Sequence, residues 1–140
     1  ALAAHAHQGQ VYPSPTGEPF ILHPLRVMLR LESEVERIVA VLHDIVEDTA
    51  YTIADLHEAG YRDDVLAAIE HLTHRKDEAY DDYIERVAQY PIARRVKLAD
   101  LSDNLANNRQ LNLLRPSPET HERIMRYERA RQRLIASATH

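Results

Sequence analysis

The chain has 140 residues, of which 44% are hydrophobic and 28% are charged, and its formal net charge is −5. This length suits one domain with a sizeable core and the composition is that of an ordinary folded protein, so we expect a single domain over residues 1–140. The negative charge argues against a long nucleic acid as partner, but a local basic cluster could still bind a small anion.

The chain contains no cysteine, so any metal ion would have to be held by histidines and carboxylates. This composition is compatible with a reducing compartment, and we expect a cytoplasmic protein. The longest apolar run covers only residues 38–42, and the first residues lack the basic flank and apolar stretch of a signal peptide. We therefore expect no membrane association.

The N-terminal segment predicts a short helix followed by a long loop. The helix is expected to end within residues 7–9. Residues 11–19 contain three prolines and a glycine, a composition that sustains neither a helix nor strand pairing. The sequence therefore predicts that this loop is the longest irregular segment.

Capping patterns mark the start of two helices. Ser33 with Glu36 fits a capping box for a helix that runs through Val46. Thr52 with Asp55 fits a second capping box. Each pattern satisfies backbone N–H groups that the first helical turn leaves unpaired.

Three further signals complete the helical pattern. Gly60 is expected to end the helix that begins after Thr52, and the apolar spacing within residues 65–72 predicts the next helix. A long helix is expected over residues 92–113, and a last one from the Ser117 N-cap to about Ala136. No stretch shows the sustained alternation typical of strands, so the predicted fold class is all-α.

The segment HDIVED, residues 43–48, concentrates one imidazole and three carboxylates. On a helix, His43 lies one turn before Glu47, and Asp44 lies one turn before Asp48, so the four share one edge. An ordinary solvated helix face is the alternative interpretation. Acidic residues at this spacing repel one another and oppose the helix dipole, however, and a bound cation would offset both penalties.

Two more side chains have apolar neighbours and are candidates for the same site. Asp100 lies in VKLADLSDN, where an unpaired carboxylate would be costly, and His23 lies between Leu22 and Pro24. Taken singly, His23 could equally be a hydrogen-bonded core histidine, and Asp100 could pair with an arginine such as Arg123. A divalent ion needs about four ligands, and some of them must come from separate elements.

The order of these residues resembles the HD hydrolase domain of the Rel/SpoT stringent-response proteins, and most closely the stand-alone small alarmone hydrolases that degrade (p)ppGpp. The match covers residues 6–130, nearly the whole chain. Its segments follow the family order: AHQGQ (6–10), GEPFILHP (17–24), LHDIVEDT (42–49), VKLADLSDN (96–104) and RIMRYERA (123–130). The HD pair alone is a weak motif, but HDIVEDT with VKLAD and GEPFILHP is highly specific. The resemblance implies an all-α, HD-domain helical bundle.

The resemblance implies that one divalent ion is held by four residues: His23, His43, Asp44 and Asp100. The ion in this family is usually manganese. Two nitrogen and two oxygen ligands without sulfur also suit Fe²⁺ and do not exclude Zn²⁺. Of the other histidines, His7 is expected to pack beside the loop.

Family members use a glutamate and an aspartate at the positions of Glu47 and Asp48 for catalysis. The implied reaction is hydrolysis of the 3′-pyrophosphate of ppGpp or pppGpp by a metal-activated water. The products would be GDP or GTP plus pyrophosphate. Glu47 and Asp48 would handle the protons.

The resemblance also implies contacts with the nucleotide. The family's asparagine at Asn104 contacts the nucleotide near the metal, and residues matching Arg123 and Tyr127 reach its phosphates. The alternative for this last pair is a surface arginine stacked on a tyrosine, which is a common cation–π arrangement.

One departure from the family lies in the loop after AHQGQ, which normally carries an Arg-Lys pair that stacks on the base and meets phosphate. Here the matching residues are Tyr12 and Pro13. Tyr12 could stack on a purine, and Ser14 still offers a hydroxyl. Three cations could replace the lost charge: Lys76, Lys97 and Arg109. Related nucleotides, such as an adenosine alarmone or NADPH, are therefore alternative substrates.

Two other classes of function remain as alternatives. One is a catalytically silent HD domain that binds a nucleotide and regulates a partner, and the other is a nucleotidase acting on ordinary mononucleotides. The retained ligands and Glu-Asp pair argue against the first, and the VKLAD and GEPFILHP contexts argue against the second. The chain is expected to be either a stand-alone hydrolase or an excised domain, without the synthetase domain of bifunctional relatives. Its oligomeric state and native ion do not follow from the sequence.

Overall fold

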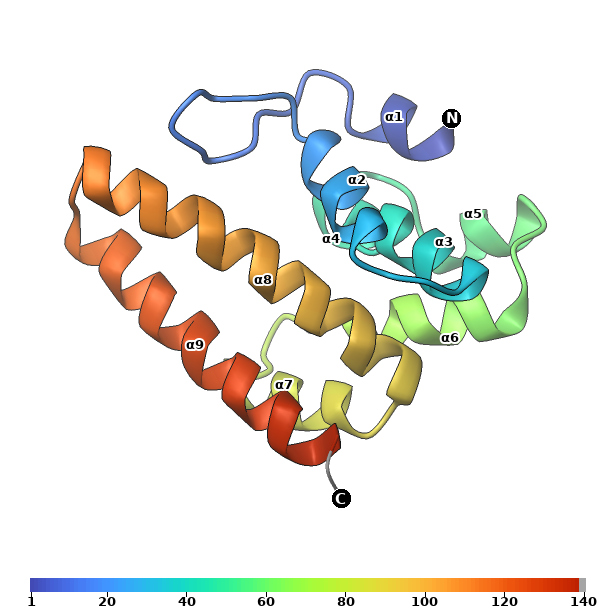
Figure 1. Ribbon diagram of the computed structural model, residues 1–140. Coiled ribbons are helices and arrows are strands. Elements are labelled where there is room, and N and C mark those ends of the chain that lie inside the picture. Colours follow the sequence, from blue (N-terminus) through green and yellow to red (C-terminus); the bar gives the residue numbers. More distant parts are fainter. Residues whose placement is uncertain (139–140) are drawn as a thin grey trace.

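The computed structural model describes residues 1–138, and this part of the chain is built of nine helices (Figure 1). The predicted all-α class is confirmed. The helices, in chain order, are α1 (Leu2–Ala6), α2 (Leu22–Leu29), α3 (Glu34–Leu42), α4 (Ile45–Asp48), α5 (Ile53–Glu58), α6 (Asp63–Leu72), α7 (Tyr80–Ala88), α8 (Pro91–Leu114) and α9 (Pro118–Ala138).

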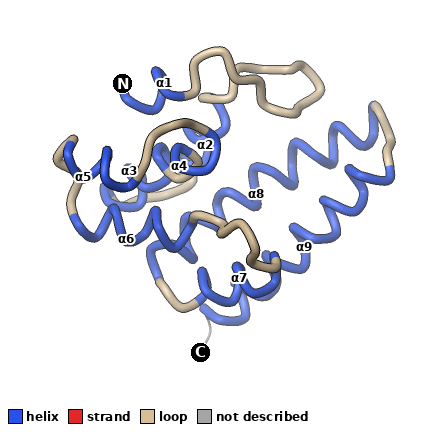
Figure 2. The backbone as a smooth tube through the Cα atoms, turned by 180° about the vertical axis from the view of Figure 1, so that it is seen from behind, coloured by secondary structure: helices blue, strands red, loops and turns tan. Residues whose placement is uncertain are grey.

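The long helix α8 organises the molecule. It runs antiparallel to α9 along one side and packs on α2, α3 and α6 on the other, and α7 packs against both α8 and α9 (Figures 1 and 2). Side chains from these helices form a continuous core that includes Val27, Val39, Ile69, Val87 and Leu101. Within residues 1–138, no helix combines the length and apolar character that a bilayer span requires.

The predicted starts of the later helices are confirmed. Thr52 and Asp55 form a complete capping box at α5, and Gly60 adopts a φ of 94° after that helix ends. Helix α8 has Pro91 in its first turn, and the hydroxyl of Ser117 accepts a 3.1 Å hydrogen bond from the backbone N–H at the third position of α9. The local sequence signals at these helix ends were therefore sufficient to predict where the helices begin.

The predicted continuous helix from Ser33 to Val46 is wrong, because it breaks into α3 and α4 at His43 and Asp44. The carbonyl of Ala40 would normally accept a bond from the N–H of Asp44, but Nδ1 of His43 lies 2.5 Å from it. Side-chain bonds of this kind compete with the helical ladder. His43 and Asp44 consequently lie in a turn.

The N-terminal cap of α3 also differs in detail from a capping box. The backbone N–H of Glu36 donates to the hydroxyl of Ser33 at 3.1 Å, as expected for an N-cap. The Ser33 hydroxyl, however, donates to the Glu36 carboxylate at 2.6 Å. Arg95 contacts the same carboxylate, so Glu36 links the start of α3 to α8.

The expectation that residues 11–19 make no strand pairing is wrong at one point. Val11 and Pro19 form an isolated antiparallel bridge, and the N–H of Tyr12 donates to the carbonyl of Glu18 at 2.8 Å. Pro19 has no N–H to donate, and its neighbours make the hydrogen bonds instead. The loop thereby folds back on itself and directs Tyr12 inward, where its side chain is only 4% exposed.

Two helices, α2 and α7, were not predicted from the sequence. Helix α2 contains Pro24 in its first turn, where the missing N–H carries little penalty. Helix α7 begins at Tyr80 after a segment without a capping side chain. Both pack on α8, and tertiary contacts therefore stabilise helices whose local signals are weak.

Candidate metal centre

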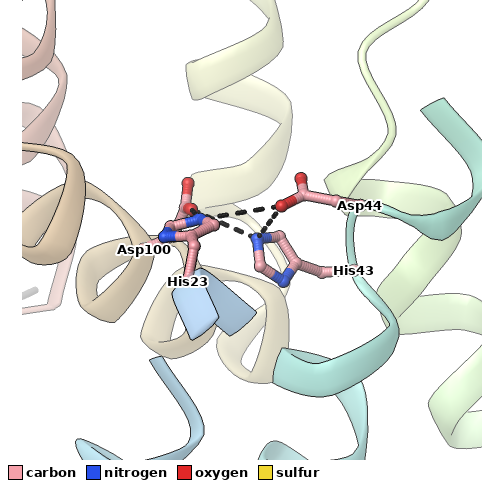
Figure 3. A group of neighbouring side chains, drawn as sticks. All are labelled: His23, His43, Asp44 and Asp100. Carbon is pink, nitrogen blue, oxygen red and sulfur yellow. Dashed lines mark hydrogen bonds and ion pairs between the residues drawn. The ribbon is translucent and has the colours of Figure 1, made fainter. Parts of the chain in front are cut away.

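Three separate parts of the chain meet at one buried point beside α8. His23 lies in the first turn of α2, His43 and Asp44 lie in the turn between α3 and α4, and Asp100 projects from the middle of α8. Figure 3 shows these four side chains pointing toward one another. The structure thus brings together the four residues that the family resemblance implied as metal ligands.

One atom from each side chain contributes to a tight cluster. Nε2 of His23 lies 2.8 Å from Oδ1 of Asp100 and 3.6 Å from Oδ2 of Asp44. Nε2 of His43 lies 3.1 Å from each of the same two oxygens. The alternative pairing of Asp100 with Arg123 is therefore wrong, because other groups occupy the carboxylate.

The geometry of these four atoms fits a single divalent ion. The four donor atoms all lie within 4.8 Å of one another. Ligands bound at about 2.0–2.2 Å to one ion lie at most about 4.4 Å apart, so a small contraction would place all four around it. The group could therefore hold a divalent metal ion.

Both imidazole rings are oriented through their other nitrogen. Nδ1 of His23 lies 2.7 Å from Oδ2 of Asp103, and Nδ1 of His43 lies 2.5 Å from the carbonyl of Ala40. Acceptors at Nδ1 hold the proton there and leave the Nε2 lone pair free toward the cluster. This is the tautomer that metal binding requires.

The cluster shifts the pKa values of its members. Burial alone lowers the pKa of His23, but its hydrogen bonds to Asp100 and Asp103 outweigh this and raise it to about 9. Burial likewise opposes ionisation of Asp100, whereas nearby Lys97 and the imidazoles hold its pKa well below the ordinary value. Without a cation, protons on the imidazoles stabilise the carboxylates, and an incoming metal ion would displace them.

Lys97 and Asn104 flank Asp100 on the same face of α8. Nζ of Lys97 lies 2.9 Å from Oδ2 of Asp100, and the amide of Asn104 donates to Oδ1 at 3.3 Å. This polar side of α8 therefore faces the cluster. Lys97 lies two turns before Asn104, and both side chains line the neighbouring cavity.

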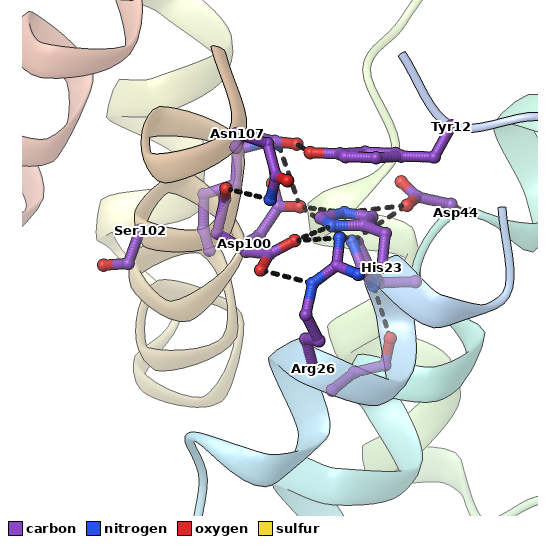
Figure 4. A network of polar contacts seen from close by, with 12 residues as sticks. Tyr12, His23, Arg26, Asp44, Asp100, Ser102 and Asn107 are labelled. Carbon is purple, nitrogen blue, oxygen red and sulfur yellow. Dashed lines mark hydrogen bonds and ion pairs between the residues drawn. The ribbon is translucent and has the colours of Figure 1, made fainter. Parts of the chain in front are cut away.

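Tyr12 covers the cluster from the loop. Its ring stacks on the His23 imidazole, with centroids 4.9 Å apart and planes 11° from parallel, and its hydroxyl donates to Oδ1 of Asn104 at 2.5 Å (Figure 4). The guanidinium of Arg26 lies 5.4 Å from the centroid of the same ring. The Tyr12 ring is therefore occupied by its contacts with His23 and Arg26. A purine could stack on the Tyr12 ring only after the loop moved.

Glu47 and Asp48 follow on the short helix α4, at the rim of the cluster. The carboxylate of Glu47 accepts a hydrogen bond from the backbone N–H of His74. Partial removal of water raises the pKa of both carboxyl groups, and the charge of Asp44 adds to this effect. The side chain of Gln10, which bonds to His7, donates to the carbonyl of Asp48 at 2.7 Å and so ties α4 to the N-terminal segment.

A cavity of about 270 Å³ opens beside the cluster. The residues that line it are Glu47, His74, Tyr80, Tyr83, Lys97, Asn104, Arg126 and Tyr127. Three of the predicted substrate contacts, Lys97, Asn104 and Tyr127, belong to this set. Arg123 and Ser14 do not; the hydroxyl of Ser14 instead lies 3.4 Å from that of Thr16 within the loop.

Sequence reasoning missed two charged residues near the site. Asp103 is buried between His23 and Arg26, and Arg126 lines the cavity from α9. Asp103 lies three residues after Asp100 and Arg126 three residues after Arg123, so helical spacing placed them near the predicted faces. Both lie within matched segments, VKLADLSDN and RIMRYERA, but nothing in those segments distinguished them from ordinary polar surface residues.

Comparison with known proteins assigns the family. No protein-family model matches the chain. The guanosine-3′,5′-bis(diphosphate) 3′-pyrophosphohydrolase MESH1 of Mus musculus is 34% identical over 134 residues, which cover 90% of this chain and 74% of the relative. The chain belongs to the HD-domain (p)ppGpp hydrolases. MESH1 of Danio rerio is 31% identical to this HD-domain chain over 136 residues, with the same coverage.

Relatives of other lengths support the same HD-domain family. The guanosine-3′,5′-bis(diphosphate) 3′-pyrophosphohydrolase of Vibrio cholerae is 31% identical over 127 residues, which form 82% of this chain but 18% of that protein. A solved structure described as a metazoan ortholog of SpoT that hydrolyzes ppGpp superimposes with a TM-score of 0.76 at 26% identity. It covers 97% of this chain and 80% of the solved one. The predicted family and its helical fold are confirmed.

Proposed function

We propose that this chain is a metal-dependent phosphohydrolase that removes the 3′-pyrophosphate of ppGpp or pppGpp and releases GDP or GTP. The observation that carries the proposal is the convergence of four metal-binding atoms within 4.8 Å in a chain 34% identical to MESH1. A divalent ion held there would polarise a phosphoryl oxygen and lower the pKa of a water molecule. Mn²⁺ is the proposed ion, with Fe²⁺ or Zn²⁺ as alternatives.

In this proposal the metal ligands are His23, His43, Asp44 and Asp100. His23, His43 and Asp100 are almost completely buried, whereas the Asp44 side chain is 17% exposed. Access therefore comes from the side of Asp44, which the cavity and α4 adjoin. Burial of the other three groups excludes water from the remaining sides and strengthens electrostatic interactions with a bound phosphate.

Glu47 and Asp48 are the proposed proton-handling residues. They are the carboxylates nearest to Asp44 along α4, and the raised pKa of each brings it closer to the range in which a carboxylate accepts a proton at neutral pH. The bond from the His74 backbone restrains Glu47, and the bond from Gln10 restrains the backbone of Asp48. These restraints would hold both carboxylates in place for proton transfer.

Lys97, Asn104 and Tyr127 are the proposed substrate contacts, because they line the cavity that adjoins the cluster. Lys97 is only 13% exposed and is ion-paired to Asp100, so it would meet a phosphate close to the reacting centre. Roles for Arg123, Ser14 and Tyr12 as substrate contacts have less geometric support, since none of them lines this cavity.

A second candidate function within the same chemistry is hydrolysis of another nucleotide, such as an adenosine alarmone or NADPH. The observation that favours it is the position of Tyr12, whose ring packs on His23, whereas the family resemblance implies a cation at this position. A base would therefore be held differently in this chain. The reaction at the metal does not depend on this residue, but the choice of base does.

The deciding experiment is a product-release assay with Mn²⁺ that compares ppGpp, pppGpp, pppApp and NADPH. Release of pyrophosphate from ppGpp with the highest kcat/KM would support the proposal. Faster turnover of pppApp or NADPH would favour the second candidate. Nucleotide binding without turnover of any of the four would contradict both and favour a regulatory, catalytically silent domain.

A further inference from the structure

Arg126 differs from Lys97, the other cation that lines the cavity, because within residues 1–138 it has no partner of opposite charge. Lys97 is ion-paired to Asp100, and Glu47 accepts a hydrogen bond from the His74 backbone. Within residues 1–138, no carboxylate lies within salt-bridge distance of the Arg126 guanidinium. The side chain is exposed where it lines the cavity. Of the two cations that line the cavity, Arg126 is therefore the one that no carboxylate pairs with in the described part of the chain.

Two tyrosines hold this guanidinium in place. Its central carbon lies 5.0 Å from the centroid of the Tyr80 ring on α7 and 5.5 Å from that of Tyr127 on α9. Contacts with ring faces restrain the side chain but leave its N–H groups free to donate. An arginine restrained in this way is prepared for a planar, bidentate interaction with a phosphate.

The position of Arg126 separates it from the metal-binding cluster. Lys97 lies against Asp100, its Nζ is 5.2 Å from the Tyr83 ring centroid, and that ring is followed by Tyr80, at 5.9 Å between centroids. The guanidinium of Arg126 lies over the face of the Tyr80 ring. A phosphate at Arg126 would thus be bound by a group that is not one of the four clustered metal-binding residues.

We propose that Arg126 binds the 5′-phosphate groups of the substrate, the groups that are not cleaved. This inference rests on the proposed function, in which the 3′-pyrophosphate lies at the metal. A phosphate-binding Arg126 would also replace positive charge that is missing here, because Tyr12 and Pro13 stand where the family resemblance implies an Arg-Lys pair. Arg109 is ion-paired to Glu128 away from the cavity, and Lys97 is neutralised by Asp100, so Arg126 supplies the charge from α9 instead.

The test compares two substrates, ppGpp and guanosine 3′-diphosphate, which lacks 5′-phosphates. Arg126→Ala is expected to raise the KM for ppGpp about tenfold or more, since it removes charge-assisted hydrogen bonds, and to leave kcat within about twofold. The KM for guanosine 3′-diphosphate should not change. Arg126→Lys should give a KM for ppGpp between those of the wild type and Arg126→Ala, because lysine retains the charge but cannot make the bidentate hydrogen bonds of a guanidinium.

Arg129→Ala is the matched control, because Arg129 lies on the same helix, carries the same charge and pairs weakly with Asp81 at 3.7 Å outside the cavity. It should leave both KM values unchanged. An equal rise for both substrates in Arg126→Ala, or no rise for either, would overturn the proposal.

A second measurement separates failure of this inference from failure of the proposed function. GDP is titrated calorimetrically into the metal-free protein, which requires no turnover. Binding about tenfold weaker in Arg126→Ala than in the wild type and Arg129→Ala supports the 5′-phosphate site, even if neither substrate is hydrolysed. Equal GDP binding in all three proteins overturns it.

Discussion

The carboxylate of Asp103 lies 2.7 Å from Nδ1 of His23, on the side of the imidazole opposite to Asp100. Arg26 binds the same carboxylate through Nε at 2.8 Å and Nη2 at 3.1 Å (Figure 4). The ring of His23 is therefore held from behind by an ion pair that joins α2 to α8. A carboxylate in this position orients a metal-binding histidine and increases its basicity.

Asp103→Asn is expected to weaken Mn²⁺ binding by about 10- to 100-fold, because the amide neither fixes the tautomer of His23 nor contributes negative charge. Isothermal titration calorimetry measures this directly. Ser102→Ala is the control, since the Ser102 hydroxyl bonds to the carbonyl of Leu98 and does not contact the cluster. Unchanged affinity in Asp103→Asn would mean that His23 is not a ligand or is oriented by packing alone.

Asp100→Ala is expected to abolish stoichiometric metal binding, because its Oδ1 contacts both imidazoles. Glu47→Gln should retain the metal and lower kcat by about 10²- to 10⁴-fold, the usual contribution of general acid–base catalysis. Elemental analysis after dialysis, together with steady-state kinetics, separates the two effects. Full metal content and activity in Asp100→Ala would show that the ligand assignment is incorrect.

Substitutions of Tyr12 should distinguish its ring from its hydroxyl. Tyr12→Phe loses the bond to Asn104 and is expected to lower the free energy of unfolding by about 0.5–1.5 kcal/mol, whereas Tyr12→Ala also removes a buried ring and should cost about 3–5 kcal/mol. Chemical denaturation measures both values. Equal losses in the two variants would contradict a stabilising role for the stack on His23.

The pair Glu78 and Arg86 should make stability depend on acid pH. Hydrogen bonds from Arg86, at 2.8 and 2.9 Å, lower the pKa of Glu78 from 4.5 to about 2. Because the folded state favours the ionised form, this contribution is fully present above about pH 4.5 and is lost as the pH falls toward 2.

Glu78→Gln should therefore reduce the free energy of unfolding by about 1.5–3 kcal/mol at pH 7 and have little effect near pH 2. Urea denaturation at a series of pH values provides the measurement. Asp77→Asn, at a neighbouring carboxylate without an ion pair in the described part of the chain, should not change the profile. A constant difference between wild type and Glu78→Gln at all pH values would contradict this explanation.

The candidate site was predictable where a residue type and its neighbours carried a signal of their own. His43 and Asp44 were recognisable as a motif, and His23 and Asp100 through their apolar contexts and family order. Asp103 was not, because its significance comes from His23, which is 80 positions away in the chain and on another helix. Arg126 was missed for the same reason, since its two aromatic contacts come partly from α7, a helix that was not predicted.

By itself, the sequence determined that the protein is helical and where most of its helices begin, because caps, glycines and apolar spacing act through hydrogen bonds within a few residues. Only the tertiary structure decided how the polar groups meet. It broke the helix at His43, turned Tyr12 inward onto His23 and left Arg126 in the cavity without a carboxylate partner in the described part of the chain. These outcomes depend on contacts between distant segments packed around α8, which no local pattern specifies.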